Sequence, residues 1–345
     1  MEIVTLYFKD EKLYLIDQRK LPNTYEIFEC ENYKDVDFAI KDMVVRGAPA
    51  IGASAAYGVV LGAKEYKGLD KDAFLKKMEE VLNVLNESRP TAVNLMWGIK
   101  RMGKVIDQNK ALSPEKIYVE LKKEADLIAK EDVEINKTMA KHGNTLVPQK
   151  ATILTHCNAG ALATVGYGTA LGVVREAFYT GKDIFVYADE TRPRLQGAKL
   201  TSWELLKEGI PSRLIPDNAA ATLIRDGKID LILVGADRVA SNGDTANKIG
   251  TFMLSVVAKA YGVPFYIVAP TSTIDFEIET GKEIVIEERD EKEVTHIGGV
   301  RIAPEGVKVY NPAFDVTPNE NITAIVTEKG VVKPHFKENL LKIKP

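Results

Sequence analysis

Hydrophobic and polar positions follow two different patterns along this chain. Near the start, short apolar runs at residues 4–8 and 12–16 flank Lys-Asp-Glu and predict a β-hairpin, with another strand near 24–29. Apolar side chains then recur every three or four positions, as at Leu75, Met78 and Leu82, which predicts amphipathic helices. The main predicted helices cover residues 50–63, 72–87, 91–107 and 114–141. Residues 1–142 are therefore predicted to form a smaller N-terminal domain, a β-hairpin plus a helical bundle.

After residue 150 the pattern changes to short apolar runs, most of them separated by helical stretches. The runs lie near residues 152–155, 184–188, 213–216, 231–235, 264–268 and 323–327. Strands and helices in alternation predict a mostly parallel sheet that helices cover on both faces. The predicted fold class is thus α/β, with residues 143–345 as the larger C-terminal domain.

Four of the predicted strands lead into a side chain that can do chemistry: Cys157, Asp189, Asp217 and Asp237. The carboxyl ends of parallel strands share one edge of a sheet, where open α/β sheets bind ligands. A free cysteine can equally be a packing residue, and such aspartates can simply cap the following helices. Asp237 is the strongest candidate for an acid, because it follows the most apolar run and precedes no clear helix start.

Cationic side chains lie in loops that contain Gly or Pro, beside predicted helix starts. Arg46 precedes Gly-Ala-Pro, Arg89 precedes Pro-Thr, and Lys248 lies in Asn-Lys-Ile-Gly. Each alone is most simply a surface charge. Together they make a phosphate site plausible, because arginine and free helix N–H groups bind phosphate oxygens.

Composition limits the classes of function. The chain has 345 residues, of which 45% are hydrophobic, and a net charge of −3, so charge indicates neither a nucleic-acid nor a membrane partner. The two cysteines form no CxxC pair, which argues against a metal knuckle or a disulfide framework and favours the cytoplasm. No signal peptide is expected, and no apolar run approaches the roughly 20 residues that span a bilayer. Scarce glutamine beside abundant lysine and glutamate favours a thermophilic source.

Several blocks of the chain resemble the methylthioribose-1-phosphate isomerase family. They include Arg46-Gly-Ala-Pro-Ala-Ile-Gly, Thr155-His-Cys-Asn-Ala-Gly-Ala-Leu-Ala-Thr, Ala188-Asp-Glu-Thr-Arg-Pro, Gln196-Gly-Ala-Lys-Leu-Thr, Val234-Gly-Ala-Asp-Arg-Val-Ala, Ala246-Asn-Lys-Ile-Gly-Thr and Asn311-Pro-Ala-Phe-Asp-Val-Thr-Pro. The blocks occur in order over nearly the whole chain. The wider superfamily also contains ribose-1,5-bisphosphate isomerase and the α, β and δ regulatory subunits of a eukaryotic translation initiation exchange factor.

The resemblance implies an aldose–ketose isomerase of methionine salvage that converts 5-methylthioribose 1-phosphate to 5-methylthioribulose 1-phosphate. It further implies a Rossmann-like C-terminal domain, a homodimer, and neither metal nor redox cofactor. The matching motifs carry over a catalytic pair and a set of substrate contacts. The catalytic pair is Cys157 and Asp237, and the substrate contacts are Arg46, Gly47, Ala48, Arg89, Gln196, Asn247 and Lys248.

Three alternatives stay open at this stage. The substrate could be another sugar 1-phosphate, such as ribose 1,5-bisphosphate or 5-deoxyribose 1-phosphate. The chain could instead be a non-catalytic regulatory subunit, although the Cys157 and Asp237 blocks favour an isomerase. Within the isomerase, hydrogen could move between C2 and C1 through an enediol with Cys157 as base, or directly as hydride.

Overall fold

The computed structural model describes residues 3–89 and 92–344, and the chain divides into two compact units. Unit 1 comprises Met1–Lys137 together with Gly160–Gly168, and unit 2 comprises Thr138–Ala159 with Thr169–Pro345. The segment Gly160–Gly168, here called the inserted loop, therefore belongs to unit 1 although unit 2 surrounds it in the sequence. The predicted single boundary at residue 142 therefore does not account for the inserted loop, which lies beyond that boundary and belongs to unit 1.

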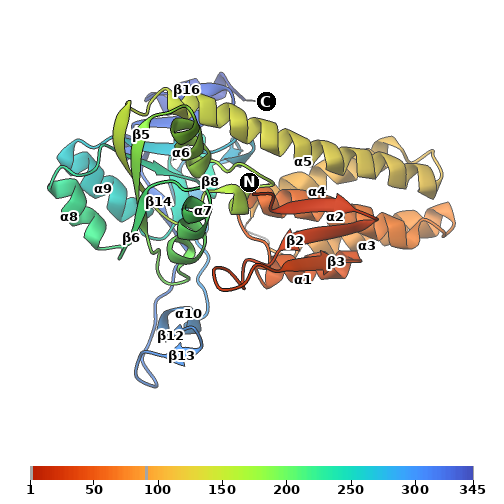
Figure 1. Cartoon of the computed structure of the whole chain (residues 1–345). Coiled ribbons are helices and arrows are strands. Elements are labelled where there is room, and N and C mark those ends of the chain that lie inside the picture. Colours follow the sequence, from red (N-terminus) through yellow and green to blue (C-terminus); the bar gives the residue numbers. More distant parts are fainter. Residues whose placement is uncertain (1–2, 90–91, 345) are drawn as a thin grey trace. The chain divides into compact units, whose positions relative to one another are not determined.

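In its described residues, unit 1 combines a small antiparallel sheet with five α-helices, as the apolar pattern predicted (Figure 1). The strands are β1 (Leu6–Lys9), β2 (Lys12–Ile16) and β3 (Ile27–Cys30), in that order across the sheet. The helices are α1 (Tyr33–Lys41), α2 (Ala48–Tyr66), α3 (Lys71–Asn86), α4 (Val93–Gln108) and α5 (Pro114–Asn144), the last of which continues into unit 2. The predicted hairpin and helices are confirmed.

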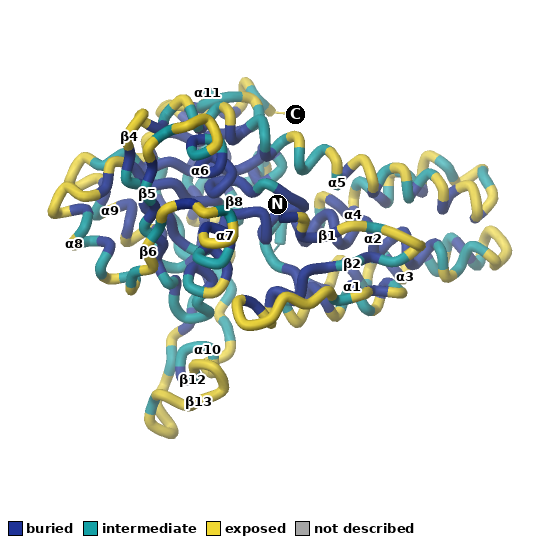
Figure 2. Tube along the Cα trace, in the orientation of Figure 1, coloured by how far each residue is buried: buried dark blue, intermediate teal, exposed yellow. Residues whose placement is uncertain are grey.

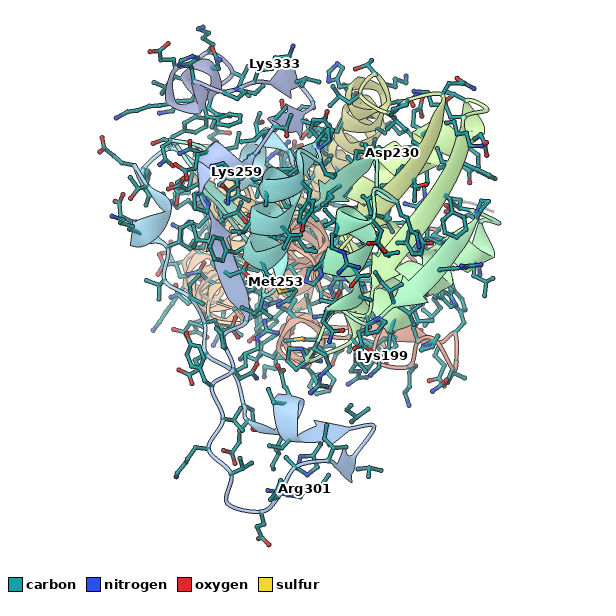
Figure 3. All side chains as sticks on the ribbon, turned by 90° about the vertical axis from the view of Figure 1, so that its left-hand side faces the viewer. Lys199, Asp230, Met253, Lys259, Arg301 and Lys333 are labelled. Atoms are coloured by element: carbon teal, nitrogen blue, oxygen red, sulfur yellow. The ribbon has the colours of Figure 1, made fainter. Side chains whose placement is uncertain are left out.

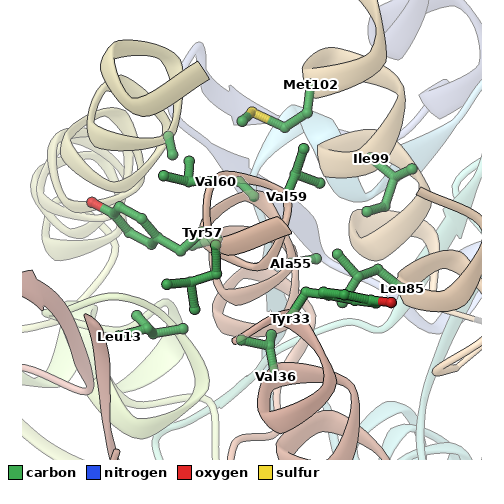
Figure 4. Close-up of a cluster of buried hydrophobic side chains, with 14 of the residues drawn as sticks. Leu13, Tyr33, Val36, Ala55, Tyr57, Val59, Val60, Leu85, Ile99 and Met102 are labelled. Atoms are coloured by element: carbon green, nitrogen blue, oxygen red, sulfur yellow. The ribbon is translucent and has the colours of Figure 1, made fainter. Parts of the chain in front are cut away.

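Helix α2 is the centre of unit 1. Its residues from Ala50 to Ala63 are all buried, because small and apolar side chains occupy every face of the helix. In Figure 4 the α2 side chains Tyr57 and Val59 lie among Leu13, Leu85 and others from the neighbouring elements. The small residues let those elements pack close to the α2 backbone.

Unit 2 is built on a seven-stranded sheet in the order β16-β15-β10-β7-β4-β5-β6. Every neighbouring pair is parallel except β15 with β16, so the predicted mostly parallel sheet is confirmed. The strands are β4 (Lys150–Thr155), β5 (Asp183–Asp189), β6 (Ser212–Ile215), β7 (Leu231–Val234), β10 (Phe265–Val268), β15 (Ala324–Thr327) and β16 (Gly330–Val332). The accompanying helices are α6 (Ala170–Tyr179), α7 (Ser202–Lys207), α8 (Ala219–Arg225), α9 (Thr251–Tyr261) and α11 (Phe336–Leu341). Figure 2 shows the central strands as the most buried part of this unit.

A second sheet in unit 2 was not predicted. It has the order β11-β8-β9-β14, with β8 (Arg238–Ala240), β9 (Thr245–Lys248), β11 (Ile274–Asp275) and β14 (Phe314–Thr317). These strands are short and rich in polar residues, so the periodicity of the sequence did not mark them. A slender extension with α10 (Lys292–Thr295), β12 (His296–Ile297) and β13 (Val300–Arg301) projects from the rest of unit 2 (Figures 1 and 3).

Among the residues that the structure describes, none of the helices combines the length and the apolar character needed to cross a membrane.

Candidate functional site

The strand order of the main sheet reverses between β4 and β7. Strands β4, β5 and β6 follow one another toward one edge, and β7, β10 and β15 follow one another toward the other. Open α/β sheets bind ligands beyond the carboxyl ends of the strands at such a reversal. Cys157 follows β4 and Asp237 follows β7, so both predicted catalytic residues come after the two strands that flank this point.

The backbone of Cys157 is held in an uncommon conformation. Its φ of 64° lies in the left-handed region, which costs a residue with a side chain about 1–2 kcal/mol. The Cys157 amide donates to Oγ1 of Thr191 at 2.8 Å, and Oγ1 of Thr201 donates to the Cys157 carbonyl oxygen at 2.6 Å. The side chain is partly exposed. A strained, well-held corner with an accessible thiol is typical of a functional position.

His156, next to Cys157, forms a buried hydrogen bond with Asp189. Nδ1 of the ring is 2.9 Å from Oδ2 of Asp189, and Nε2 is 2.8 Å from the carbonyl oxygen of Ile249. Burial raises the pKa of Asp189 to about 6, although the hydrogen bond with His156 acts in the opposite direction. Asp189 therefore holds the imidazole of the residue that directly precedes Cys157.

The alternative that Asp189 and Asp217 cap the following helices is wrong. Asp189 is bonded to His156, and Asp217 accepts from the backbone amides of Thr191 and Arg192 at 2.6 and 2.7 Å. Helix α8, which follows Asp217, has no side-chain cap. The partners come from a neighbouring strand end, because the parallel sheet brings β5 and β6 together there.

A second buried network holds Asn158, the residue that follows Cys157. Nδ2 of Asn158 donates to Oε1 of Glu204 at 2.8 Å, and Glu204 forms an ion pair with Arg175. Arg175 also donates through Nε to Oε2 of Glu208 at 2.7 Å. All four side chains are almost fully buried and are bonded to one another. The network therefore fixes the residue that follows Cys157.

The unpredicted second sheet brings Asp237 close to two other predicted site residues. Strands β8 and β9 are antiparallel with Arg238 opposite Ala246, and the Asp237 amide donates to the Ala246 carbonyl at 2.9 Å. Asn247 and Lys248 follow on β9, where both are buried. This antiparallel pairing thus brings Asp237 beside the strand that carries Asn247 and Lys248.

Lys248 and Gln196 are polar side chains in a largely closed environment. Nζ of Lys248 donates to the Ala313 carbonyl at 2.8 Å and lies 4.1 Å from the centre of the Phe314 ring. Gln196 is 7% exposed, and its Oε1 is buried without a hydrogen-bond partner among the described residues. An unpartnered buried amide oxygen is costly unless a ligand donates to it.

The remaining predicted contacts, Arg46, Gly47, Ala48 and Arg89, lie in unit 1. Helices α2 and α4, which follow Arg46 and Arg89, cross near their N-termini: a Cβ on Gly52 would lie 2.7 Å from the Asn94 carbonyl oxygen. The two N-terminal dipoles therefore converge within unit 1, and two arginines precede them. Pro90 and Thr91, which belong to the same predicted motif, lie outside the described residues.

The inserted loop is bonded into unit 1 through its backbone. Thr5 Oγ1 donates to the Ala161 carbonyl at 2.6 Å, Gln18 Nε2 donates to the Leu162 carbonyl at 2.7 Å, and the Val165 amide donates to Asp132 at 2.7 Å. Gly47, at φ 97°, packs so close to this loop that a Cβ would lie 2.4 Å from Cα of Ala163. The Arg46–Ala48 corner thus contacts the segment that begins shortly after Cys157 in the chain.

One cluster of described residues has the composition of a metal site. Ligand atoms of His156, Asp189 and Asp217 lie within 4.8 Å of one another. Both nitrogens of His156 are in hydrogen bonds, and Asp217 already accepts two backbone N–H groups. A metal ion would have to displace the proton between His156 and Asp189, so this cluster is better explained as a hydrogen-bonded network.

Sequence reasoning missed the residues that hold Cys157 in place. His156, Thr191, Thr201 and Glu204 carry no catalytic motif of their own, and their roles depend on contacts between distant strands. The available signal was a run of polar residues, Thr-His-Cys-Asn, between a buried strand and a stretch of small residues. Buried polar side chains need partners, so this run indicated a network without indicating its members.

Comparisons with known proteins agree over most of the chain. The profile of the initiation factor 2 subunit family matches residues 44–334. A methylthioribose-1-phosphate isomerase from Thermoanaerobacter sp. (strain X514) is 73% identical over 343 residues, covering 99% of both chains. The crystal structure of 5-methylthioribose 1-phosphate isomerase from Pyrococcus horikoshii OT3 matches with a TM-score of 0.93 and 48% identity, over 99% of this chain and 95% of that one.

A second solved structure concerns the regulatory alternative. The crystal structure of the translation initiation factor eIF-2B, subunit delta, from A. fulgidus matches with a TM-score of 0.88 and 45% identity, over 99% of both chains. The higher identity and equal coverage of the Thermoanaerobacter protein decide the assignment. The chain belongs to the initiation factor 2 subunit family and, within it, to the methylthioribose-1-phosphate isomerases.

Proposed function

We propose that this protein converts 5-methylthioribose 1-phosphate to 5-methylthioribulose 1-phosphate in methionine salvage, with Cys157 and Asp237 as the catalytic pair. The observation that carries the proposal is their position after β4 and β7, the strands that flank the switch point of the sheet. The 73% identity to a relative with this name, over 99% of the chain, supports the same reaction.

The chemistry needs an acid before hydrogen can move. The phosphate on the anomeric oxygen blocks ordinary ring opening, so the ring oxygen must receive a proton as the C1–O bond breaks. Asp237 is the proposed donor; after ring opening, hydrogen passes from C2 to C1 and the C2 hydroxyl returns its proton to the Asp237 carboxylate, which leaves a ketone at C2. In one route Cys157 removes the C2 proton to give an enediol and a proton returns to C1. In the other, hydride moves directly from C2 to C1.

The phosphate is proposed to bind through cations and helix ends. Arg46 and Arg89 precede converging helix N-termini in unit 1, and Lys248 is a buried cation in unit 2. Gly47, Ala48, Gln196 and Asn247 complete the proposed contacts. These groups would offset the phosphate charge and orient C1 and C2, which supplies positioning rather than chemistry. The reaction is redox-neutral overall, so the proposal includes no electron carrier.

The test is the activity of Cys157→Ser and Asp237→Asn on synthetic 5-methylthioribose 1-phosphate, measured as ketose formation. Both variants should keep the fold and lose at least about 1,000-fold in kcat, the scale on which loss of a catalytic acid or base acts. Near-normal turnover by either variant would remove that residue from the scheme. With deuterium at C2 of the substrate in ordinary water, label retained at C1 supports direct transfer and label lost supports the enediol.

The C5 substituent is tested by a substrate series. We expect the methylthio compound to react with the highest kcat/KM, ahead of 5-deoxyribose 1-phosphate and ribose 1,5-bisphosphate. A preference for the bisphosphate would reassign the substrate. A chain that turns over none of the three but binds a translation factor would instead be a regulatory subunit, which is the alternative that the A. fulgidus structure raises.

A homodimer is part of the proposal. Helix α9 exposes Phe252, Met253 and Val256 on one face, and Met253 is labelled there in Figure 3. A second copy of this chain is the proposed cover for that apolar face, because the family resemblance implies a dimer. Val256→Glu should shift the mass measured by light scattering toward the monomer, whereas an unchanged mass would exclude α9 from the interface.

A further inference from the structure

The imidazole of His156 is hydrogen-bonded at both nitrogens inside unit 2. A carbonyl oxygen can only accept, so the 2.8 Å contact from Nε2 to Ile249 means that Nε2 carries a hydrogen. The 2.9 Å contact from Nδ1 to Asp189 then requires one more proton, supplied by the ring or by the carboxyl group. Without that proton, a lone pair of Nδ1 would face a lone pair of the carboxylate. His156 and Asp189 therefore share a single proton.

The surroundings of this pair retain the proton. Both side chains are 1% exposed, so bulk water does not compete for it. The charged groups that act on the pair from neighbouring elements are Glu190, Asp217 and Asp315, with Lys248 beside Asp315. Burial raises the pKa of Asp189. For His156, burial lowers the pKa, but the hydrogen bond to Asp189, the charges of Asp189 and Asp217 and the Ile249 carbonyl together raise it above its usual value. Three carboxyl groups against one cation favour a proton that stays in place at neutral pH.

The pair joins the ends of three strands. His156 follows β4, Asp189 ends β5, and Ile249 follows β9. The ring also packs on Gly250, where a Cβ would lie 2.9 Å from Cε1 of the imidazole. His156 directly precedes Cys157, and its Nε2 donates to the carbonyl oxygen of Ile249, which directly follows Lys248. The imidazole therefore links these two segments.

We propose that His156 and Asp189 are positioning residues of the reaction: their shared proton fixes the imidazole, and the fixed imidazole sets Cys157 against the segment that carries Asn247 and Lys248. The proposal rests on the catalytic role proposed for Cys157. Neither residue needs to touch the substrate. Thr191 extends the same device, because its hydroxyl accepts from the Cys157 amide and donates to the Asp189 carbonyl at 3.1 Å.

Two substitutions at position 189 separate the shared proton from the filling of space. In Asp189→Asn the amide can donate to Nδ1, so the ring stays in place without a titrating carboxyl group. Asp189→Ala leaves Nδ1 without its partner. We expect Asp189→Ala to lower kcat about 100-fold with KM changed by less than about threefold, because a misplacement near 1 Å costs that much. Asp189→Asn should return kcat to within about tenfold of the wild type, with a changed acid limb of its pH profile.

A purely structural role gives another pattern. The two variants would then lose stability while the kcat of the folded fraction stayed the same, and asparagine would not rescue the loss in Asp189→Ala. An unchanged kcat of the folded fraction, or no rescue by asparagine, overturns the proposal. His142→Gln is the matched control, because His142 also bonds through Nδ1, at 2.9 Å from the Thr327 carbonyl, without a link to Cys157 among the described contacts. It should leave kcat unchanged.

The shared proton can be observed without turnover. In protein with ¹⁵N-labelled histidine, NMR should show a far-downfield proton in the hydrogen bond between Nδ1 of His156 and Asp189 from about pH 5 to about pH 8. The signal is assigned by its loss in His156→Gln and should disappear in Asp189→Ala. A wild-type spectrum at neutral pH without this proton would contradict the proposal.

Failure of the proposed function is distinguishable from failure of this inference. In a Cys30→Ala background, the rate of Cys157 alkylation by iodoacetamide reports the position of the thiol without catalysis. Asp189→Ala should change that rate by about fivefold or more, and Asp189→Asn by less. Full activity of Cys157→Ser would end the catalytic role of Cys157, whereas an alkylation rate that is indifferent to both Asp189 variants would end the positioning role of the pair.

Discussion

Replacing Asp132 by asparagine should make the stability of unit 1 less sensitive to rising pH. Asp132 lies on α5, and its Oδ2 accepts from the Val165 amide at 2.7 Å and from Nδ2 of Asn136 at 3.1 Å. Both donors are neutral, and no cation contributes to the pKa of this carboxyl group. Burial therefore dominates and raises the pKa of Asp132 from 3.8 to about 7. Asp132 anchors the inserted loop at the expense of carrying a poorly solvated charge.

The sign and size of the effect follow from linkage. The folded protein binds the Asp132 proton more tightly than the unfolded chain does, so stability falls as the pH rises from about 4 to about 7 and then levels off. A shift from 3.8 to about 7 corresponds to about 4 kcal/mol as an upper limit. Asp132 is only partly buried as a residue, so water relaxes this cost and we expect about 1–2 kcal/mol.

The assay compares urea unfolding of Asp132→Asn and the wild type at pH 4 and pH 8. Trp97 lies in unit 1 and Trp203 in unit 2, so a Trp203→Phe background makes fluorescence report on unit 1. The gain in stability from asparagine should be larger at pH 8 by about 1–2 kcal/mol. Exposed Asp72→Asn is the control and should show no such difference. An equal effect of Asp132→Asn at both pH values would refute the argument.

Three further substitutions test the packing around the site. Gly47→Ala should destabilise unit 1 by about 2–4 kcal/mol in urea unfolding, because the residue has φ 97° and no room beside the inserted loop; an unchanged midpoint would contradict that contact. Glu204→Gln removes the negative charge that pairs with the buried Arg175 guanidinium and should lower the free energy of unfolding by about 3–5 kcal/mol, measured by thermal unfolding. A loss smaller than about 1 kcal/mol would show that water reaches the pair. Thr201→Val removes the hydroxyl that donates to the Cys157 carbonyl and should cost about 1–2 kcal/mol; alkylation of the thiol should change with it, and a rate equal to that of the wild type would argue against a held corner.

Local patterns in the sequence determined the elements of this protein. The apolar runs from residues 152 to 327 became the strands of the main sheet, and the three- and four-residue spacing became α3, α4 and α5. Such patterns are reliable because a strand or helix buries its apolar face whatever its neighbours are. They also placed Cys157 and Asp237 at strand ends, and the family resemblance then selected these two from four candidates.

Tertiary structure alone decided which strand ends meet. Nothing in the local pattern shows that β7 lies beside β4, yet this pairing puts the residues after both strands at the switch point. The inserted loop and the His156–Asp189 pair have the same origin, since both depend on hydrogen bonds between residues far apart in the chain. A polar side chain in the sequence shows that a partner is needed, and only the packed fold determines which partner it has.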